Sequence, residues 1–130
     1  MDLVRRPEMF DVIVAPNLFG DIVTDIGAII TGSMGLASSA NINPDTSVPS
    51  MFEPTHGSAP DIAGQGIANP MAQILTAAMM LRHLGENAAA TDVDAAVLQL
   101  LEQGETLTPD LGGSSTTELV GDAIAQLVSK

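Results

Sequence analysis

Two aspartates, Asp21 and Asp25, lie four residues apart in a segment whose apolar pattern predicts a helix over residues 18–31. A four-residue spacing places both carboxylates on one face of a helix. Carboxylate oxygens are the ligands that a hard cation such as Mg²⁺ or Mn²⁺ prefers. The other interpretation is that both acids simply favour the positive N-terminal end of the helix. The spacing alone leaves both interpretations open.

A glycine-rich stretch over residues 53–70 carries the second group of polar side chains. Glycines let a backbone approach a ligand closely, and the His, Ser, Asp and Asn side chains offer the donors and acceptors that an adenine and a ribose require. An acidic side chain near the ribose favours NAD over NADP, because it repels a 2′-phosphate. The G-x-G-x-x-G dinucleotide fingerprint is absent. The alternative is an ordered surface loop with His56 packed beneath it.

The elements that must position these groups follow from the apolar pattern. Residues 11–15 form a short β-branched run, which predicts a buried strand of a parallel sheet. The helix over residues 18–31 follows, with Asn17 as its N-cap. Residues 37–50 predict a loop, and residues 51–54 predict a short strand.

The second half of the chain predicts a long loop and three helices. The loop covers residues 55–69, and loops of this length inside a domain are usually functional. A helix is expected from Asn69 to Gly85 and another over residues 91–103. A glycine-rich connection over residues 109–115 leads to a last helix, whose apolar stripe comprises Leu119, Val120, Ala123, Ile124, Leu127 and Val128.

The order of these elements favours an α/β fold with few parallel strands flanked by helices. A parallel pair needs companion strands before both faces of a sheet are covered. The chain also opens as if in mid-structure, because residues 3–6 resemble the end of a helix. We therefore expect one part of a larger α/β protein.

Composition excludes several classes of function. The 130 residues suit one domain, and a net charge of −12 argues against nucleic acid or an anionic membrane as partner. No Cys is present, so disulfide and thiol chemistry are excluded. The longest apolar stretch, residues 74–81, is too short to span a bilayer, and no signal peptide is visible. A cytoplasmic protein is therefore the expectation.

Two long motifs resemble the β-hydroxyacid oxidative decarboxylases, a family that includes isopropylmalate, isocitrate, homoisocitrate and tartrate/D-malate dehydrogenases. They are Asn-Leu-Phe-Gly-Asp-Ile-x-x-Asp at residues 17–25 and Glu-Pro-x-His-Gly-Ser-Ala-Pro-Asp-Ile-Ala-Gly-x-Gly-Ile-Ala-Asn-Pro at residues 53–70. The stretch over residues 110–118 is similar to the family's C-terminal segment. The resemblance implies a partial isopropylmalate-dehydrogenase-like fold, incomplete relative to the family.

The resemblance also implies a role for each matching residue. Asp21 and Asp25 correspond to ligands of Mg²⁺ or Mn²⁺. Asp61 corresponds to the residue that binds the adenosine ribose, and the pair Asp61-Ile62 implies NAD, since NADP-dependent relatives carry Lys and Tyr there. The full set of implied cofactor-binding residues is Glu53, His56, Gly57, Ser58, Ala59, Asp61, Ile62 and Asn69.

The groups that would do the family's acid–base chemistry have no match in this chain. The family uses a catalytic Tyr, a catalytic Lys and a cluster of Arg residues upstream of the part represented here. This chain has no Tyr, its one Lys is Lys130, and Arg5, Arg6 and Arg82 match none of the cluster. We therefore assign no catalytic residue and expect the chain to be inactive alone.

The expected function is the C-terminal portion of an NAD- and Mg/Mn-dependent oxidative decarboxylase of 3-substituted malates, with 3-isopropylmalate dehydrogenase as the best match. A tartrate/D-malate or isocitrate dehydrogenase fragment is an alternative, as is a non-catalytic oligomerising or nucleotide-binding remnant. Residues 1–35 are expected to derive from the dimerisation and metal-site lobe and residues 36–130 from the cofactor-loop lobe. A homodimer or larger assembly is expected.

Overall fold

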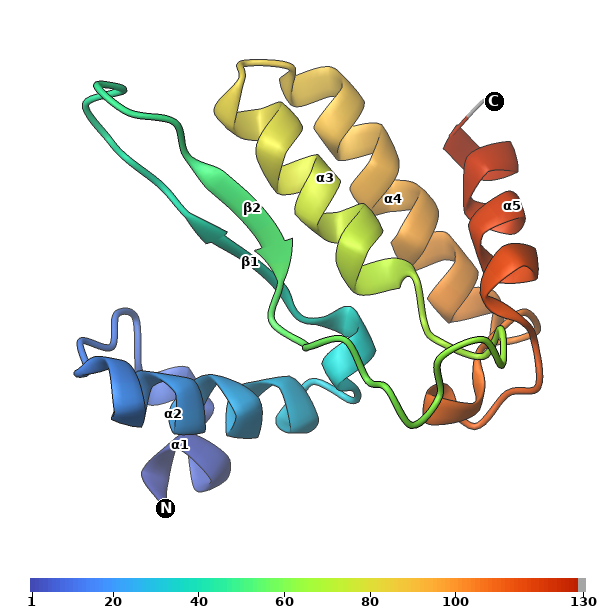
Figure 1. Cartoon of the computed structure of the whole chain (residues 1–130), viewed down its shortest axis with the longest axis horizontal. Coiled ribbons are helices and arrows are strands. Elements are labelled where there is room, and N and C mark those ends of the chain that lie inside the picture. Colours follow the sequence, from blue (N-terminus) through green and yellow to red (C-terminus); the bar gives the residue numbers. More distant parts are fainter. Residues whose placement is uncertain (129–130) are drawn as a thin grey trace.

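The computed structural model describes residues 1–128 as five α-helices, three short 3₁₀ helices and one two-stranded sheet (Figure 1). In chain order, the elements of the N-terminal half are α1 (Asp2–Arg5), η1 (Pro7–Met9), α2 (Asn17–Ile30), η2 (Met34–Leu36), β1 (Ser38–Asn41) and β2 (Met51–Pro54). Those of the C-terminal half are α3 (Met71–His83), α4 (Asn87–Gln103), η3 (Pro109–Leu111) and α5 (Thr117–Val128).

The sheet is an antiparallel hairpin, so the expected parallel pairing is wrong. β1 pairs with β2 in a register that joins Ser38 to Pro54 and Asn41 to Met51. Residues 11–15, the expected strand, adopt no regular structure, and Val14 is 94 % exposed. A strand needs a partner for its backbone groups, and no other strand in the described part of the chain lies beside this run.

The segment that does pair with β2 was expected to be a loop. β1 has the sequence Ser38-Ser39-Ala40-Asn41, which has little intrinsic preference for a strand. The backbone ladder holds it nevertheless, and the pairing is extended by a bond from the Thr55 N–H to the Ala37 carbonyl, 3.0 Å long. Tertiary pairing therefore outweighs local propensity here.

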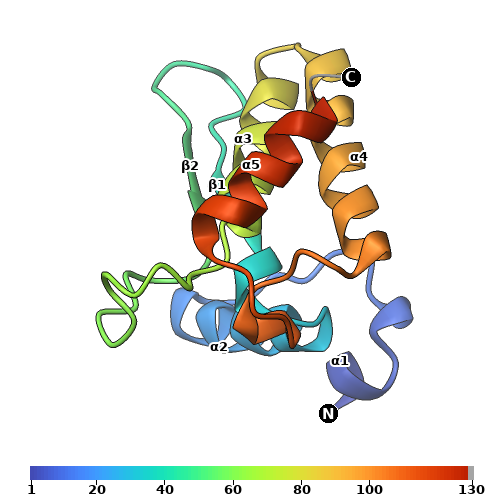
Figure 2. The ribbon, with the colours of Figure 1, turned by 90° about the vertical axis from the view of Figure 1, so that its right-hand side faces the viewer.

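The core lies where α3 meets α4 and α5 (Figures 1 and 2). Its buried members come from all three helices and are Met71, Ala96, Val97, Leu100, Val120 and Ile124. α3 also packs against the hairpin on its other side. The chain has no Trp or Tyr, and the buried residues of α3 and α4 include four alanines, namely Ala72, Ala78, Ala90 and Ala96.

The helix boundaries agree with expectation except at two N-termini. α4 begins at Asn87, four residues earlier than expected, because the segment Asn87–Ala90 is rich in alanine and the Ala90 N–H already bonds to the Glu86 carbonyl. α2 begins at Asn17 itself, with Pro16 before it, and no side chain caps its first turn. The expected capping role of Asn17 is therefore wrong.

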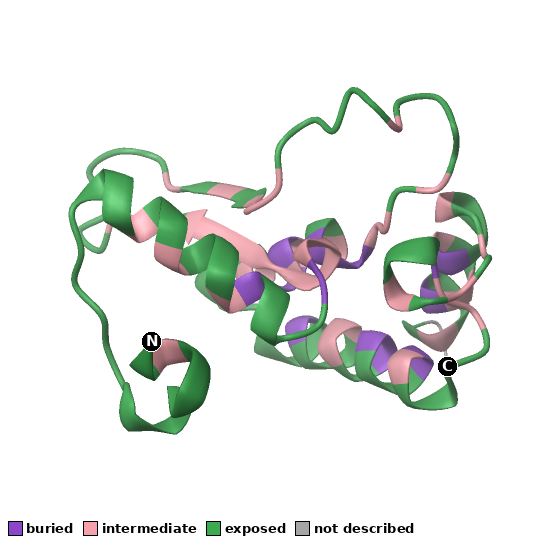
Figure 3. Cartoon of the chain, turned by 90° about the horizontal axis from the view of Figure 1, so that it is seen from below, coloured by how far each residue is buried: buried purple, intermediate pink, exposed green. Residues whose placement is uncertain are grey.

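The N-terminal part of the chain buries little of its apolar surface. α2 buries only Ala28, and Figure 3 shows most of α2 and the segment before it in the exposed colour. The large apolar side chains left exposed there include Phe10, Val12, Ile13, Val14, Leu18, Phe19, Ile22, Ile26, Ile29 and Ile30. Most of the large apolar side chains of this segment therefore remain in contact with solvent. Within residues 1–128, no helix has the length and apolarity to cross a bilayer.

The tight turn at Gly113 provides a test of the packing within the connection between α4 and α5. A Cβ at this position would lie 2.0 Å from the Leu107 carbonyl oxygen, whereas a Cβ at Gly121 in α5 would meet nothing within 4 Å. We predict that Gly113→Ala lowers the free energy of unfolding by about 1–3 kcal/mol, because backbone must shift. Gly121→Ala is the matched control and should raise it by up to about 1 kcal/mol. Urea denaturation of both variants measures this, and equal effects would contradict the packing described here.

Candidate functional site

A cavity of about 830 Å³ lies between the loop over residues 55–69, the turn before η2, and the segments that begin η3 and α5. Its lining is mostly apolar and backbone, with a few polar side chains. The residues that line it are Ser33, Met34, Gly35, His56, Gly57, Ser58, Ala59, Ile62, Ala63, Gly64, Gly66, Ile67, Ala68, Asn69, Asp110 and Thr117. A concave site with a small number of placed polar groups is typical of cofactor pockets.

Six of the eight residues expected to bind the cofactor line this cavity. They are His56, Gly57, Ser58, Ala59, Ile62 and Asn69. Glu53 and Asp61 do not line it. Both side chains are exposed to solvent, Glu53 on β2 and Asp61 on the loop. Their roles in binding stay predictions.

Short turns give the loop its shape. Ala59 has a φ of 41°, in the left-handed region, and its carbonyl accepts from the Ile62 N–H at 3.1 Å. The Ile62 carbonyl then accepts from the Gln65 N–H at 3.2 Å. Gly66, with a φ of 66°, adopts the same left-handed region without the steric cost that a Cβ would bring. The loop therefore holds a defined path although it contains no helix or strand.

The end of the loop is fixed to the start of α5 by Thr117. The Thr117 N–H donates to the Gly66 carbonyl at 2.8 Å, and its Oγ1 donates to the Ala68 carbonyl at 2.5 Å. At the other end of the loop, Nδ1 of His56 lies 3.0 Å from the Gly57 carbonyl oxygen. Because a carbonyl oxygen can only accept, Nδ1 is the donor in that bond.

Asp110 is the carboxylate of the cavity wall. Its oxygens accept from Oγ of Ser33 at 2.5 Å, from Oγ1 of Thr108 at 2.5 Å and from Nδ2 of Asn69 at 3.0 Å. Partial burial by itself would raise the pKa of Asp110, but the hydrogen bonds from Ser33, Thr108 and Asn69 together outweigh it. They hold the pKa of this carboxyl below its ordinary value.

Sequence reasoning did not select Asp110. It follows a proline in a short polar segment, and nothing local marks it as a binding residue. Its partners Ser33 and Asn69 lie 77 and 41 residues away. The available signal was the similarity of residues 110–118 to the family's C-terminal segment, which implies that residues near Asp110 lie close to the cofactor in some members, but we chose none of them as a site residue.

The expected metal ligands, Asp21 and Asp25, lie on α2, and both are exposed. Between them, Oγ1 of Thr24 donates to backbone carbonyls of its own helix and does not bond to either carboxylate. Two carboxylates suit a hard cation but provide only part of an octahedral shell. Within residues 1–128, no group of three or more His, Cys, Asp or Glu side chains could hold a metal ion.

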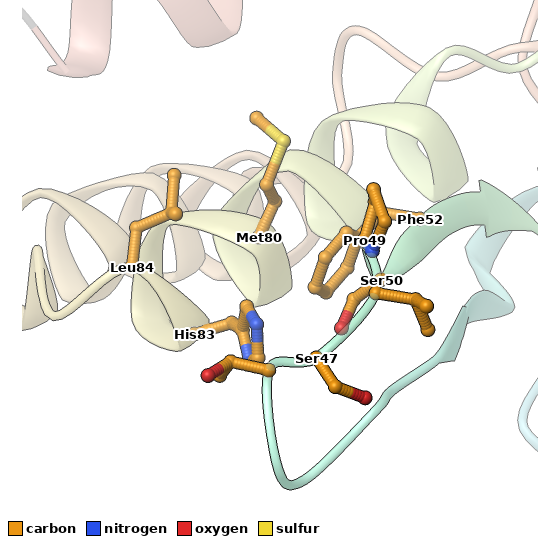
Figure 4. Close-up of a pocket in the computed structure, with 9 residues that line it drawn as sticks. Ser47, Pro49, Ser50, Phe52, Met80, His83 and Leu84 are labelled. Carbon is orange, nitrogen blue, oxygen red and sulfur yellow. The ribbon is translucent and has the colours of Figure 1, made fainter.

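A second, smaller cavity of about 460 Å³ lies between the hairpin tip and the end of α3 (Figure 4). Phe52 and His83 meet there with ring centroids 5.4 Å apart. The serines of its rim already have partners in the hairpin, since Ser50 accepts from the Asn43 N–H and Ser47 donates to Asp45. None of the expected site residues lines this cavity.

The family profile described as isocitrate/isopropylmalate dehydrogenase matches residues 1–124. The chain belongs to this family. It is 56 % identical over 130 residues to a probable tartrate dehydrogenase/decarboxylase of Bacillus subtilis. It is 58 % identical over 126 residues to an isocitrate/homoisocitrate dehydrogenase of Thermus thermophilus, and 52 % identical over 130 residues to a 3-isopropylmalate dehydrogenase of Thermobifida fusca. These matches cover 97–100 % of this chain but only 36 % of each relative.

Solved structures of the family agree with the fold. The chain superposes on an isocitrate dehydrogenase of Methylococcus capsulatus with a TM-score of 0.91 at 45 % identity, covering 100 % of this chain and 38 % of that one. It superposes on a beta-decarboxylating dehydrogenase of Thermococcus kodakarensis with a TM-score of 0.84 at 44 % identity, covering 98 % and 37 % respectively. The expected family and the expected partial α/β fold are therefore confirmed.

The lowered pKa of Asp110 predicts how stability depends on pH. The folded state favours the ionised carboxylate, so this contribution is complete at neutral pH and is lost as the pH falls through the ordinary value of 3.8 and below. We predict that Asp110→Asn is less stable than the unsubstituted chain at neutral pH and that the difference shrinks on acidification below that value. Urea titrations across this range measure it. The matched control for the loss of a carboxylate is Asp122→Asn on the exposed side of α5.

Proposed function

We propose that this chain supplies the adenosine side of the cofactor pocket and two metal-binding carboxylates of an NAD-dependent, Mg²⁺- or Mn²⁺-dependent oxidative decarboxylase of 3-substituted malates. The observation that carries the proposal is the convergence of His56, Gly57, Ser58, Ala59, Ile62 and Asn69 on one cavity. These residues come from a single loop that Thr117 and Asp110 hold in place. Membership of a dehydrogenase family supports the same conclusion.

The lining of the cavity fits the chemistry of an adenosine. Ile62 and Ile67 offer apolar surface for a flat ring, and Asn69 and Ser58 offer donors and acceptors for its polar edge. Asp61, exposed on the same loop, would accept from ribose hydroxyls and would repel a 2′-phosphate, which favours NAD over NADP. When bound, the nicotinamide would accept the hydride and the divalent cation would act as a Lewis acid on the substrate's oxygens.

The metal-binding residues of the proposal are Asp21 and Asp25. Four residues apart on one helix face and open to solvent, they supply carboxylate oxygens, the ligand type that Mg²⁺ and Mn²⁺ favour. The same stretch of chain continues through the end of α2 into Ser33 and Gly35, which line the cavity. One segment thus connects the two parts of the proposed site.

The identity of the 3-substituted malate is also part of the proposal. Relatives at 52–58 % identity are named as tartrate, isocitrate/homoisocitrate and 3-isopropylmalate dehydrogenases, so identity does not separate these substrates. The Ile67-Ala68-Asn69-Pro70 context and the Asp110-Leu111-Gly112-Gly113 context favour 3-isopropylmalate, and hence leucine biosynthesis. The loop over residues 41–50 favours a tartrate/D-malate dehydrogenase. A cytoplasmic location is part of the same proposal.

The side-chain types that the family resemblance assigns to proton transfer and substrate binding, namely Tyr, Lys and Arg, do not line the cavity. The chain contains no Tyr, and no Arg lines the cavity. Arg6 pairs with Asp2 at 2.9 Å, and Arg82 pairs with Asp94 at 2.6 Å between α3 and α4. Lys130 lies outside the described residues. We therefore propose that the 130-residue chain binds cofactor but does not turn over substrate alone.

Titration calorimetry with NAD⁺ and NADP⁺ tests the cofactor part of the proposal. We predict that the chain binds NAD⁺ more tightly than NADP⁺, and that Asp61→Ala removes most of this preference because the carboxylate that repels the 2′-phosphate is gone. Asp122→Ala is the matched control on an exposed helix face.

An assay with NAD⁺, Mg²⁺ and 3-isopropylmalate should show no turnover. Measurable turnover would contradict the proposed inactivity, and absence of NAD⁺ binding would leave only the non-catalytic, oligomerising alternative.

We also propose that residues 1–35 derive from a dimerisation and metal-site lobe and residues 36–130 from a cofactor-loop lobe, and that the chain self-associates. The exposed apolar face of α2, with Phe19, Ile22 and Ile26, supports this.

Sedimentation velocity tests the self-association. We predict a dimer or larger assembly that Ile22→Glu weakens by at least about tenfold in Kd, because a charge would be buried at the interface. The matched control is Val48→Glu on the hairpin, which is similarly exposed and should leave the assembly unchanged. A monomer at micromolar concentration for the unsubstituted chain would overturn this part.

A further inference from the structure

We propose that Asp110 is the positioning residue that assembles the cofactor pocket, acting through Ser33 and Asn69. This inference rests on the proposed function, since it assigns a role in the pocket described there. Asp110 itself follows Thr108 at the start of η3, after the end of α4. Its carboxylate joins its own stretch of chain, through Thr108, to the stretches that contain Ser33 and Asn69.

The two carboxylate oxygens of Asp110 accept hydrogen bonds from different stretches of the chain. Oδ2 accepts from Oγ of Ser33 at 2.5 Å and from Nδ2 of Asn69 at 3.0 Å. Oδ1 accepts from Oγ1 of Thr108 at 2.5 Å. An ionised carboxylate can accept from all three donors at once, and hydrogen bonds to a charged acceptor are the stronger kind.

Each residue that donates to Asp110 also accepts a hydrogen bond from a backbone N–H. Oγ of Ser33 accepts from the Gly35 N–H at 2.9 Å and so caps η2. Oδ1 of Asn69 accepts from the Met71 N–H at 3.0 Å, where α3 begins. Thr108 is fully buried, and its carbonyl accepts from the Gly113 N–H. The carboxylate thus fixes the rotamers of two side chains that in turn fix the starts of two helices.

The side chain of Asn69 packs tightly against the backbone of η2 at Gly35. A Cβ at Gly35 would lie 2.6 Å from Cβ of Asn69, so the backbone of η2 rests directly against the Asn69 side chain. Asn69 is at once the last residue of the loop and a lining residue of the cavity. A shift of this side chain therefore moves the end of the loop and the wall together.

The direction of these hydrogen bonds makes the inference testable by exchange of two side chains. Asp110→Asn leaves one acceptor oxygen for three donors, so at least one of Ser33, Asn69 and Thr108 loses its acceptor. Asn69→Asp places two carboxylates where the present contact is 3.0 Å, which repel each other. When both substitutions are combined, the asparagine at 110 can donate to the aspartate at 69 and to Oγ of Ser33. The aspartate at 69 can still accept from the Met71 N–H.

The experiment measures NAD⁺ affinity by calorimetry and amide hydrogen exchange at Gly35 and Met71 for the unsubstituted chain, both single variants and the double variant. Each single variant should lose about tenfold in NAD⁺ affinity, and its amides at residues 35 and 71 should exchange faster. The NAD⁺ affinity of the double variant should return to within about threefold of that of the unsubstituted chain. Asp122→Asn is the control for charge and should change neither quantity. If Asp110 had a merely structural role, the substitutions would lower the melting temperature, and their losses in NAD⁺ affinity would add in the double variant.

Two outcomes overturn the inference. One is a double variant as impaired as the sum of the singles in both measurements. The other is unchanged exchange at Gly35 and Met71 in both single variants. Failure of the proposed function is distinguishable, because the exchange measurements need no ligand. If the unsubstituted chain binds no NAD⁺, the proposed function fails, while recovery of slow exchange in the double variant still supports Asp110 as the residue that assembles the wall.

Discussion

The burial of α3 is the constraint on which the rest of the structure depends. Its first residue, Met71, is fully buried together with Ala72, and the helix then packs the hairpin on one side and α4 on the other. A two-stranded hairpin is marginal on its own in water, so β1 and β2 persist because α3 covers one of their faces. The start of the same helix fixes Asn69, and with it the end of the loop. Core and pocket therefore share one element, and a change that loosens α3 loosens both.

The pocket wall uses polar contacts where the core uses apolar ones. Asp110, Ser33 and Asn69 are brought together from distant positions in the sequence, and within residues 1–128 no buried side-chain nitrogen or oxygen lacks a hydrogen-bond partner. Satisfied polar networks of this type specify one arrangement, because a partial loss leaves donors without acceptors. The glycine-rich loop gains its order in the same way, from Thr117 at its end and its own turns.

The sequence predicted the main helices, because they leave local patterns: the stripe on α5 and the boundaries of α3 follow from helical periodicity. Six of the eight residues that the family resemblance assigned to cofactor binding line one cavity, because they belong to one contiguous motif, and their role in binding stays a prediction. The sheet was predicted poorly. Residues 11–15 have the composition of a strand but no partner, whereas Ser38–Asn41 have the composition of a loop but pair with β2. Asp110 was missed for a related reason, since its role depends on contacts 41 and 77 residues away.

The two-stranded sheet has a further consequence. Within residues 1–128 the sheet has two strands, so each pairs along one side, and along the other its N–H and C=O groups face away from the ladder. Such margins are where proteins add a strand from another chain. The side chains of β1 are short, whereas β2 carries Met51, which is half exposed, and Phe52, whose ring lies against His83 of α3. The hairpin thus has two unpaired edges, and β2 provides the more apolar one.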